Sequence, residues 1–392
     1  MKKVLFITPS LCQGGVEHSL ITALENIDEK KYDITLYLYV DKLDLLPEVP
    51  PYVKTIVEID KTKYFRKIKS AALLFMVYLC KLLKLKKAED KFSKKLYAYI
   101  HKKKVEYPSK HGLKNKSFDA VVSYSVHIGS LMALEIPAKK RVLFLHSSDP
   151  YYHRDITEEV FQKFDEIVAV SGGVEAVYET AFPEIKDKLS VLKNFVDAEK
   201  VLKKGEEEFC EYEEHKKSGK TVVCSCGRLS EEKGYDMAVD AAKILKEKGI
   251  KFVWYFVADG KERGKIEKRI ADFGLKGEVV ITGYKENPYP YIKNCDIFVQ
   301  PSYEEAQPIV LLETQILGKA IVSTETVGGK VILEKGEKGV LTEISAGGLA
   351  GGILKLIEDE SLRKSFENLY TFETNLKEKS NYRSKWETLL GE

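Results

Sequence analysis

Two glutamates, Glu305 and Glu313, lie eight positions apart on either side of an apolar run that starts at Pro308. Proline is favoured in the first turn of a helix, so we expect a helix to begin there, with Glu305 in the preceding loop. The amides from Gln307 to Ile309 would present the positive end of this helix to an anionic group, between carboxylates that can bind sugar hydroxyls. The alternative is an ordinary structural or solvated role. The apolar neighbours of Glu313 favour a buried face, where a carboxylate needs a partner.

Two cations, Arg228 and Lys233, lie five positions apart in CSCGRLSEEKGYDMAVDA, between an apolar run and a helical pattern. On such a loop they would converge on the phosphates of a ligand, Arg228 through its planar guanidinium and Lys233 as a point charge. The neighbouring Glu231 and Glu232 are equally consistent with a solvated loop without a ligand.

A glycine pair, Gly14 and Gly15, follows the first apolar run in TPSLCQGGVEHS. Backbone amides and a helix N-terminus at this turn could bind an anion. Because glycine is common in turns for steric reasons, a turn without a ligand is the alternative. The sequence lacks G-x-G-x-x-G, which disfavours an NAD-dependent dehydrogenase.

A histidine, His146, ends the apolar run RVLFLHS, at the predicted carboxyl end of a strand. A lone histidine is often structural, but this position favours a hydrogen-bonding or acid/base group that acts near pH 7.

The elements that must position these residues are strands and helices in alternation. Runs rich in Val, Ile and Phe are typical of parallel strands that are covered on both faces, and their alternation with helical patterns predicts doubly wound sheets. We therefore predict an α/β fold with two Rossmann-like parallel-sheet domains that face a central cleft. The expected strands are KVLFITP, DITLYLYV, VKTIVEI, DAVVSYS, RVLFLHS, EIVAVS and KLSVLKN, then TVVCSCGRL, KFVWYFVAD, VVITGY, DIFVQPS, AIVSTE and GVLTE.

The domain boundary is predicted near residues 194–220, where the sequence is charged and weakly patterned. The first domain would comprise residues 1–195, with a basic insertion at about 61–116, and the second residues 196–375. Residues 376–392 have the pattern of an amphipathic helix that we expect to pack back on the first domain. Because ligands bind outside the carboxyl ends of the strands in open α/β sheets, the residues above would line the cleft.

Composition narrows the class of protein. The 392 residues are 44% hydrophobic and 31% charged, as in an ordinary globular protein of about two domains. Six cysteines are scattered without a C-x-x-C or Cys/His cluster, which argues against a disulfide framework or a zinc site. The N-terminal run is interpreted as a buried strand, and no apolar run reaches the roughly 18 residues of a membrane-spanning helix. We therefore expect a cytoplasmic location.

A basic segment, residues 61–104, contains 15 Lys or Arg and two acidic residues, although the net charge of the whole chain is only +3. Its apolar core, Ala71 to Cys80, is flanked by lysines and is too short to span a bilayer. We expect this segment to bind an anionic membrane surface as a cationic interfacial helix. The alternative is a helical hairpin with solvated lysines. Nucleic acid is disfavoured, because no recognised nucleic-acid module accompanies the segment.

The sequence resembles the retaining glycosyltransferases of family 4, also called glycosyl transferases group 1, which have the GT-B fold. EEAQPIVLLETQILGKAIVST looks like the E-x7-E segment of that family, and CGRLSEEKGYDMAVDA is similar to its G-R-L-x-x-x-K-G segment. QGGVEHS, LHSSDP and VLKNFVD match further segments, in order along nearly the whole chain. The variant with Gln-Pro after the first glutamate looks most like enzymes of bacterial surface-polysaccharide or teichoic-acid assembly.

The resemblance implies a role for each matching residue. Arg228 and Lys233 would bind the donor diphosphate, Glu305 would hold the donor sugar, and His146 would lie near the reacting sugar. These are the implied catalytic residues. Glu313 would bind the ribose. The full set of implied donor-binding residues is Gly14, Gly15, Gly227, Tyr284, Gln307, Pro308, Ile309 and Glu313. The first domain would bind the acceptor and the second the nucleotide-sugar donor.

Four positions depart from the usual family pattern, namely Ala306, Thr314, Ala320 and Lys330. Lys330 stands where an acidic residue commonly follows the second glycine in that family. The sequence contains no D-x-D motif for a metal, so Arg228, Lys233 and helix amides would stabilise the leaving diphosphate.

The function that the resemblance implies is a retaining, metal-independent hexosyltransferase of surface-polysaccharide biosynthesis. It would transfer a sugar from a nucleotide-diphosphate sugar, with UDP-sugar favoured over GDP-sugar, to a glycan or lipid-linked acceptor, without a cofactor. Such an enzyme would work peripherally on the inner face of the cytoplasmic membrane. The alternatives are a GT-B nucleotide-sugar epimerase or phosphorylase and a non-catalytic GT-B scaffold subunit of a polysaccharide assembly complex.

Overall fold

The computed structural model describes residues 1–40, 42–57, 112–151, 158–367 and 369–391. The basic segment 61–104, for which we predict membrane contact, and most of the insertion at about 61–116 lie outside the described residues.

The first domain is built on a seven-stranded parallel sheet in the order β3-β2-β1-β4-β5-β6-β7. Alternate residues of β1 face opposite sides, so that Val4 and Phe6 pack under α1 while Leu5 and Ile7 pack under α5 and α7. Every strand here coincides with one of the apolar runs predicted from the sequence. The strands are β1 (Lys2–Thr8), β2 (Tyr32–Leu38), β3 (Lys54–Val57), β4 (Phe118–Ser123), β5 (Ala138–Leu145), β6 (Glu166–Ala169) and β7 (Leu189–Val191). The helices are α1 (Gly15–Asn26), α5 (Ile128–Leu134), α6 (Glu158–Phe161) and α7 (Gly172–Ala181), with short 3-10 turns η1 (Leu46–Glu48), η2 (Leu113–Asn115) and η3 (Pro183–Lys188).

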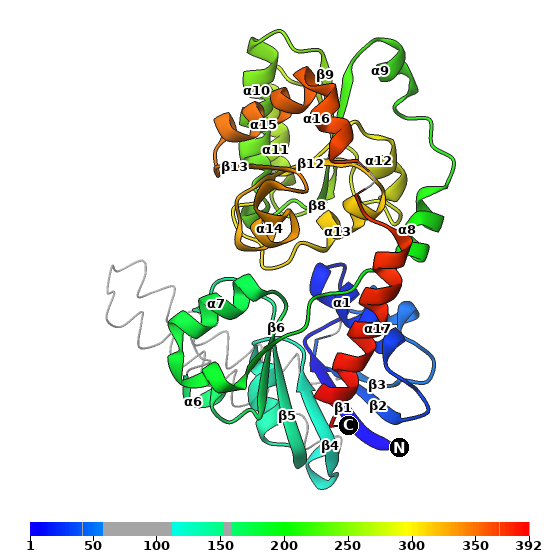
Figure 1. Cartoon of the computed structure of the whole chain (residues 1–392), viewed down its shortest axis with the longest axis vertical. Coiled ribbons are helices and arrows are strands. Elements are labelled where there is room, and N and C mark those ends of the chain that lie inside the picture. Colours follow the sequence, from blue (N-terminus) through cyan, green and yellow to red (C-terminus); the bar gives the residue numbers. More distant parts are fainter. Residues whose placement is uncertain (41, 58–111, 152–157, 368, 392) are drawn as a thin grey trace, which may run out of the picture.

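The second domain has a six-stranded parallel sheet in the order β10-β9-β8-β11-β12-β13. One face is covered by α10, α11 and α15, and the other by α8, α12 and α13. The strands are β8 (Thr221–Arg228), β9 (Phe252–Asp259), β10 (Val279–Ile281), β11 (Ile297–Gln300), β12 (Ala320–Thr324) and β13 (Val340–Thr342). The helices are α8 (Ala198–Gly205), α9 (Glu213–Lys217), α10 (Tyr235–Glu247), α11 (Arg263–Asp272), α12 (Tyr289–Asn294), α13 (Ile309–Ile316), α14 (Val327–Ile332), α15 (Ala346–Glu358) and α16 (Glu360–Ser365), with η4 (Glu231–Lys233) and η5 (Glu334–Gly336). The predicted fold class, two Rossmann-like parallel-sheet domains, is confirmed (Figure 1).

The strand order places one switch point in each sheet. Strand β1 pairs with both β2 and β4, and strand β8 pairs with both β9 and β11. Successive strands are added on opposite sides of each of these pairs, and in open α/β sheets such a switch point is where a ligand is expected, outside the carboxyl ends of the strands. The glycine pair follows β1. In the second domain Arg228 is the last residue of β8, Lys233 lies in the loop after β8, and Glu305 lies in the loop after β11.

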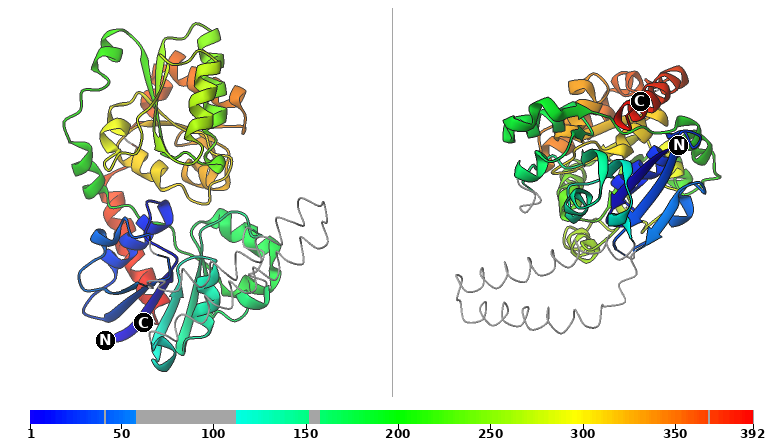
Figure 2. Two further views of the ribbon diagram at one scale, coloured as in Figure 1. Left: turned by 180° about the vertical axis from the view of Figure 1, so that it is seen from behind. Right: turned by 90° about the horizontal axis from the view of Figure 1, so that it is seen from below.

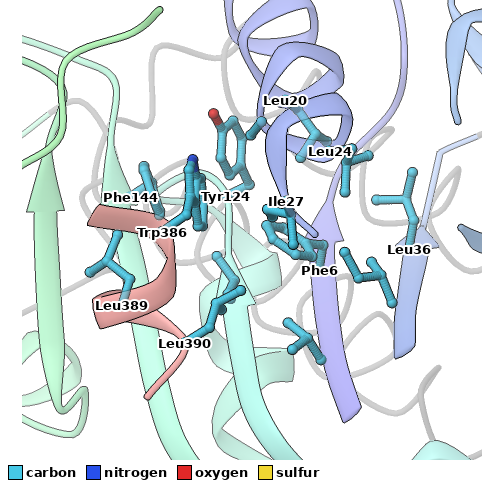
Figure 3. Packing of buried hydrophobic residues seen from close by; sticks show 14 of the residues in the cluster. Phe6, Leu20, Leu24, Ile27, Leu36, Tyr124, Phe144, Trp386, Leu389 and Leu390 are labelled. Carbon is cyan, nitrogen blue, oxygen red and sulfur yellow. The ribbon is translucent and has the colours of Figure 1, made fainter. Parts of the chain in front are cut away.

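The chain ends in α17 (Phe372–Leu389), which returns to the first domain, so that both termini lie close together (Figures 1 and 2). The Trp386 ring is buried against Phe144, with centroids 5.2 Å apart, and against Phe6 at 5.7 Å (Figure 3). The chain passes between the domains twice, once near Asp197 and once at the start of α17. An ion pair joins these two connections, because Lys379 of α17 lies 2.8 Å from Asp197. The last helix therefore completes the core of the domain in which the chain begins.

Candidate active site

The Glu305 carboxylate is the most heavily bonded group of the candidate site. Three donors converge on its Oε1 atom: Lys233 Nζ at 2.6 Å, Gln300 Nε2 at 2.8 Å and Ser302 Oγ at 2.8 Å. The Glu305 residue is 8% exposed, and its loop lies between β11 and α13. Since the burial of an unpaired carboxylate is costly, these donors hold the side chain in one place.

The loop after β8 brings the cation pair to this carboxylate. Gly234 has a φ of +63°, and a Cβ at this position would collide with the Pro301 carbonyl oxygen, so the turn requires glycine. The turn places Lys233 against Glu305. Arg228 is exposed at the end of β8, and no hydrogen bond or ion pair joins its guanidinium to the residues that the structure describes. Gly227 directly precedes it and lies against Tyr235.

The glycine pair meets the start of α13 across the domain interface. A Cβ added to Gly15 would lie 3.9 Å from Ile309 Cδ1. Helix α1 begins at Gly15 and α13 at Ile309, one residue later than expected, because Pro308 is extended and precedes the helix. Two helix N-termini from different domains therefore approach each other, a combination that favours an anionic group.

The segment 304–307 is bonded to the first domain on both sides of Glu305. Three separate loops of that domain contribute. The bonds are Ser148 Oγ to Glu304 Oε1 at 2.9 Å, Ser171 Oγ to the Ala306 carbonyl at 2.9 Å, and Asn194 N to Gln307 Oε1 at 2.8 Å. The Gln307 side chain thus joins the domains. The backbone amide of Gln307, for which we predict donor binding, lies just before α13, which begins at Ile309.

Glu313 lies in the second turn of α13, half-buried, and accepts a hydrogen bond from Tyr289 OH at 2.8 Å. Burial raises the pKa of the Glu313 carboxyl, and this shift is opposed by the Tyr289 hydrogen bond and by the positive charge of Lys204. The partner that the sequence required for this carboxylate is therefore a tyrosine. Tyr284, which follows Gly283, is 55% exposed and makes no hydrogen bond within the described part of the site.

His146 lies at the carboxyl end of β5, with its ring 4.9 Å from the Tyr124 ring and 5.9 Å from the Phe144 ring, between centroids. Burial lowers the pKa of His146 to about 3, although a hydrogen bond to the Tyr124 backbone partly opposes the shift. At pH 7 the imidazole is therefore neutral, which favours the hydrogen-bonding role over the acid/base role near pH 7. Its Nε2 atom is buried without a partner among the described residues.

Several residues of the site were not predicted from the sequence. Gln300 and Ser302 hold Glu305, and Tyr289 holds Glu313. A signal for the first two was present in FVQPS, where polar residues follow a buried strand. Lys330, the unusual residue, pairs with Glu325 at 2.9 Å beside a hollow of about 650 Å³. Among the described residues, no group of His, Cys, Asp and Glu is arranged to hold a metal ion, and no helix is long and apolar enough to cross a membrane.

Comparison with solved structures identifies the fold. The chain superposes over its whole length on Anabaena HepE in complex with UDP and glucose, with a TM-score of 0.68, 17% identity and coverage of 99% of that chain. It also superposes on a mutant of S. aureus TarM in complex with Fondaparinux, alpha-GlcNAc-glycerol and UDP, with a TM-score of 0.70, 13% identity and complete coverage of both chains. The architecture is the GT-B fold.

Residues 208–369, most of the second domain, match the family Glycosyl transferases group 1. Over 143 residues the chain is 34% identical to the lipopolysaccharide core biosynthesis glycosyltransferase LpsE of Rhizobium meliloti, an alignment that covers 36% of this chain and 41% of LpsE. It is 26% identical over 183 residues to N-acetylgalactosamine-N,N'-diacetylbacillosaminyl-diphospho-undecaprenol 4-alpha-N-acetylgalactosaminyltransferase of Campylobacter jejuni, covering 46% of this chain and 47% of that enzyme. The chain thus spans less than half the length of these two curated relatives.

We predict that Glu313→Gln stabilises the ligand-free protein at neutral pH. Because the folded-state pKa of Glu313 is raised, its ionised form destabilises the fold above the unfolded pKa of about 4.3, and this penalty vanishes as the pH falls below that value. The free energy of unfolding, measured with urea, should therefore exceed that of the wild type at pH 7 but not at pH 4. The exposed Glu337→Gln variant serves as the control. A gain that is independent of pH would contradict the prediction.

Proposed function

We propose that this protein is a retaining hexosyltransferase that transfers a sugar from a nucleotide-diphosphate sugar to a glycan or lipid-linked acceptor in surface-polysaccharide biosynthesis. The proposal is carried by two observations: Lys233 pairs with Glu305 in the loops that follow β8 and β11, and the N-termini of α1 and α13 approach each other across the domain interface. It is supported by the names of the relatives, which include glycosyltransferases of lipopolysaccharide and of diphospho-undecaprenol-linked glycans.

Positive charge at the diphosphate would stabilise the transition state. As the nucleoside diphosphate leaves, negative charge grows on its phosphates and the anomeric carbon gains oxocarbenium character. The exposed Arg228, Lys233 and the N-termini of α1 and α13 would stabilise that charge. We propose that these groups act without a metal ion. UDP-sugar is favoured over GDP-sugar because the HepE and TarM structures contain UDP.

The remaining residues would fix the position of the donor. Glu305 would accept hydrogen bonds from sugar hydroxyls and Glu313 from the ribose, while the neutral His146 would hydrogen-bond near the reacting sugar. Tyr284, exposed on the loop after β10, would contact the base. Gly14 and Gly15 would let the backbone approach the diphosphate.

Retention of anomeric configuration is part of the proposal. The acceptor hydroxyl would attack from the face that the nucleotide leaves, and the leaving phosphate would take its proton. With an α-linked donor, NMR of the product should show an α-anomeric proton coupling. A β-linked product would rule out retention.

Arg228→Ala should abolish most nucleotide binding, because a charge-assisted contact to phosphate is worth about 1.5–3 kcal/mol, which corresponds to a Kd roughly 10 to 150 times weaker. Calorimetric titration and thermal shift with UDP, GDP, ADP, CMP and NAD, without metal, will measure this effect. Arg363→Ala, in the same domain and paired with Glu360 on α16, is the matched control.

One nucleoside diphosphate should stabilise the wild type and the Arg363→Ala variant, but not Arg228→Ala. If no nucleotide binds the folded wild type, the scaffold alternative replaces the proposal. Interconversion of UDP-sugars without an acceptor would instead identify an epimerase.

We further propose that the basic segment 61–104 brings the enzyme to an anionic membrane. A lipid-linked acceptor, such as the diphospho-undecaprenol glycan in the name of the Campylobacter relative, would require this contact. Each basic residue near anionic lipid contributes about 1 kcal/mol. Replacement of Lys81, Lys84, Lys86 and Lys87 by Glu should therefore abolish co-sedimentation with anionic liposomes. Unchanged co-sedimentation would count against membrane contact.

A further inference from the structure

Two buried polar side chains, Gln300 and Ser302, lie at the end of β11, beside the switch point of the second sheet. Gln300 is 3% exposed and Ser302 is fully buried. Polar groups are costly to bury unless they are hydrogen-bonded. Here their side-chain hydrogen bonds are directed toward Glu305.

The hydrogen bonds run in one direction. Gln300 Nε2 donates to Ser302 Oγ at 2.6 Å and to Glu305 Oε1 at 2.8 Å, and Ser302 Oγ donates its own proton to Glu305 Oε1 at 2.8 Å. Thr324 Oγ1 donates to the Ser302 carbonyl, which fixes the backbone beneath. The Glu305 carboxylate therefore accepts hydrogen bonds from two neutral donors, Gln300 and Ser302.

The orientation of the Gln300 amide is set by this carboxylate. Its Oε1 atom is buried and has no partner among the described residues. The reverse orientation would point a carbonyl oxygen at a carboxylate, and two acceptors cannot bond to each other. An unpartnered buried acceptor carries an energetic cost, which is typical of groups that serve a functional site.

The two oxygens of Glu305 are in different situations. Oε1 receives Gln300, Ser302 and Lys233, whereas Oε2 receives no hydrogen bond from the described part of the chain. Lys233 differs from the other two donors, because its side chain is charged and 23% exposed.

We propose that Gln300 and Ser302 are positioning residues that hold Glu305 for the donor sugar, and that Lys233 is an exchangeable third donor. Without ligand, Lys233 neutralises Glu305. When a diphosphate binds, Lys233 moves to the phosphate, while Gln300 and Ser302 keep Oε1 fixed and Oε2 accepts a sugar hydroxyl. Binding of the diphosphate would thus exchange the partner of Lys233 and leave the Glu305 carboxylate held by Gln300 and Ser302. This inference rests on the proposed function.

The test separates binding of the nucleotide from binding of the sugar. Affinities for UDP and for UDP-glucose, together with KM and kcat for UDP-glucose turnover, are measured for the wild type, Gln300→Leu, Ser302→Ala and Lys233→Met. The matched control is Gln315→Leu, a buried glutamine of the same domain that donates to the Ile332 carbonyl. Thermal unfolding of each variant checks that it is folded.

Gln300→Leu and Ser302→Ala should bind UDP within about twofold of the wild type but lose about tenfold or more in affinity for UDP-glucose and in kcat, as expected for hydrogen bonds to a charged group. Lys233→Met should weaken both ligands. If Gln300 and Ser302 only supported the fold, their replacement would lower the affinities for UDP and for UDP-glucose in parallel. That result, or unchanged UDP-glucose binding in the two positioning variants, would overturn the inference and leave the proposed function intact.

Gln300→Glu provides a second readout. It would place a carboxyl group beside Glu305, and two adjacent carboxylates share a proton at low pH. Its activity relative to the wild type should therefore rise as the pH falls from about 8 to about 5, and a constant ratio would contradict the assignment. A wild type that binds neither UDP nor UDP-glucose would overturn this inference for a UDP-sugar donor, whereas a wild type that binds none of the screened nucleotides would overturn the proposed function as well.

Discussion

A carboxylate taken out of water must be surrounded by donors, and Glu305 obtains its donors from three positions, of which Lys233 lies 72 residues away in sequence. Lys233 reaches it from the loop after β8, and Gln300 and Ser302 from the end of β11. These loops can converge only because β8 and β11 are neighbours in the sheet. The turn at Gly234, which packs against the Pro301 carbonyl, brings them together. Much of the local geometry of the site follows from the need to satisfy this one charge.

Segment 304–307, which carries Glu305, also joins the two domains. Glu304, Ala306 and Gln307 bond to three different loops of the first domain, while Glu305 points into the second. Segment 304–307 therefore carries both the Glu305 carboxylate and three hydrogen bonds to the first domain. The second crossing of the chain, where α17 returns to the first domain, adds a further tie through Lys379 and Asp197.

Two charged groups of the site, Arg228 and Glu313, are not arranged to stabilise the ligand-free protein. Arg228 is left without a partner among the described residues, and Glu313 is half-buried with a raised pKa. Real proteins depart from optimal packing and pairing at functional sites. A diphosphate would match Arg228, and a ribose hydroxyl would match Glu313. The neutral state of His146 is consistent with this, because an imidazole packed against Tyr124 and Phe144 can offer a hydrogen bond without adding charge.

The sequence by itself predicted the strands and the two parallel-sheet domains, and it indicated the sheet edge at which we expect ligands to bind. Apolar runs and helical periodicity are local properties, so they can be recognised in the sequence. Because ligands bind at the carboxyl ends of parallel strands, residues that directly follow a predicted strand are expected near the binding site. It also indicated Glu305, Glu313, Arg228 and Lys233 as a group. Only the tertiary structure decided which side chains meet. The pairing of Lys233 with Glu305, the donors Gln300 and Ser302, and the burial that keeps His146 neutral all depend on segments that are far apart in sequence. Spacing along a chain does not encode such contacts, because adjacency of strands and depth of burial are properties of the whole fold.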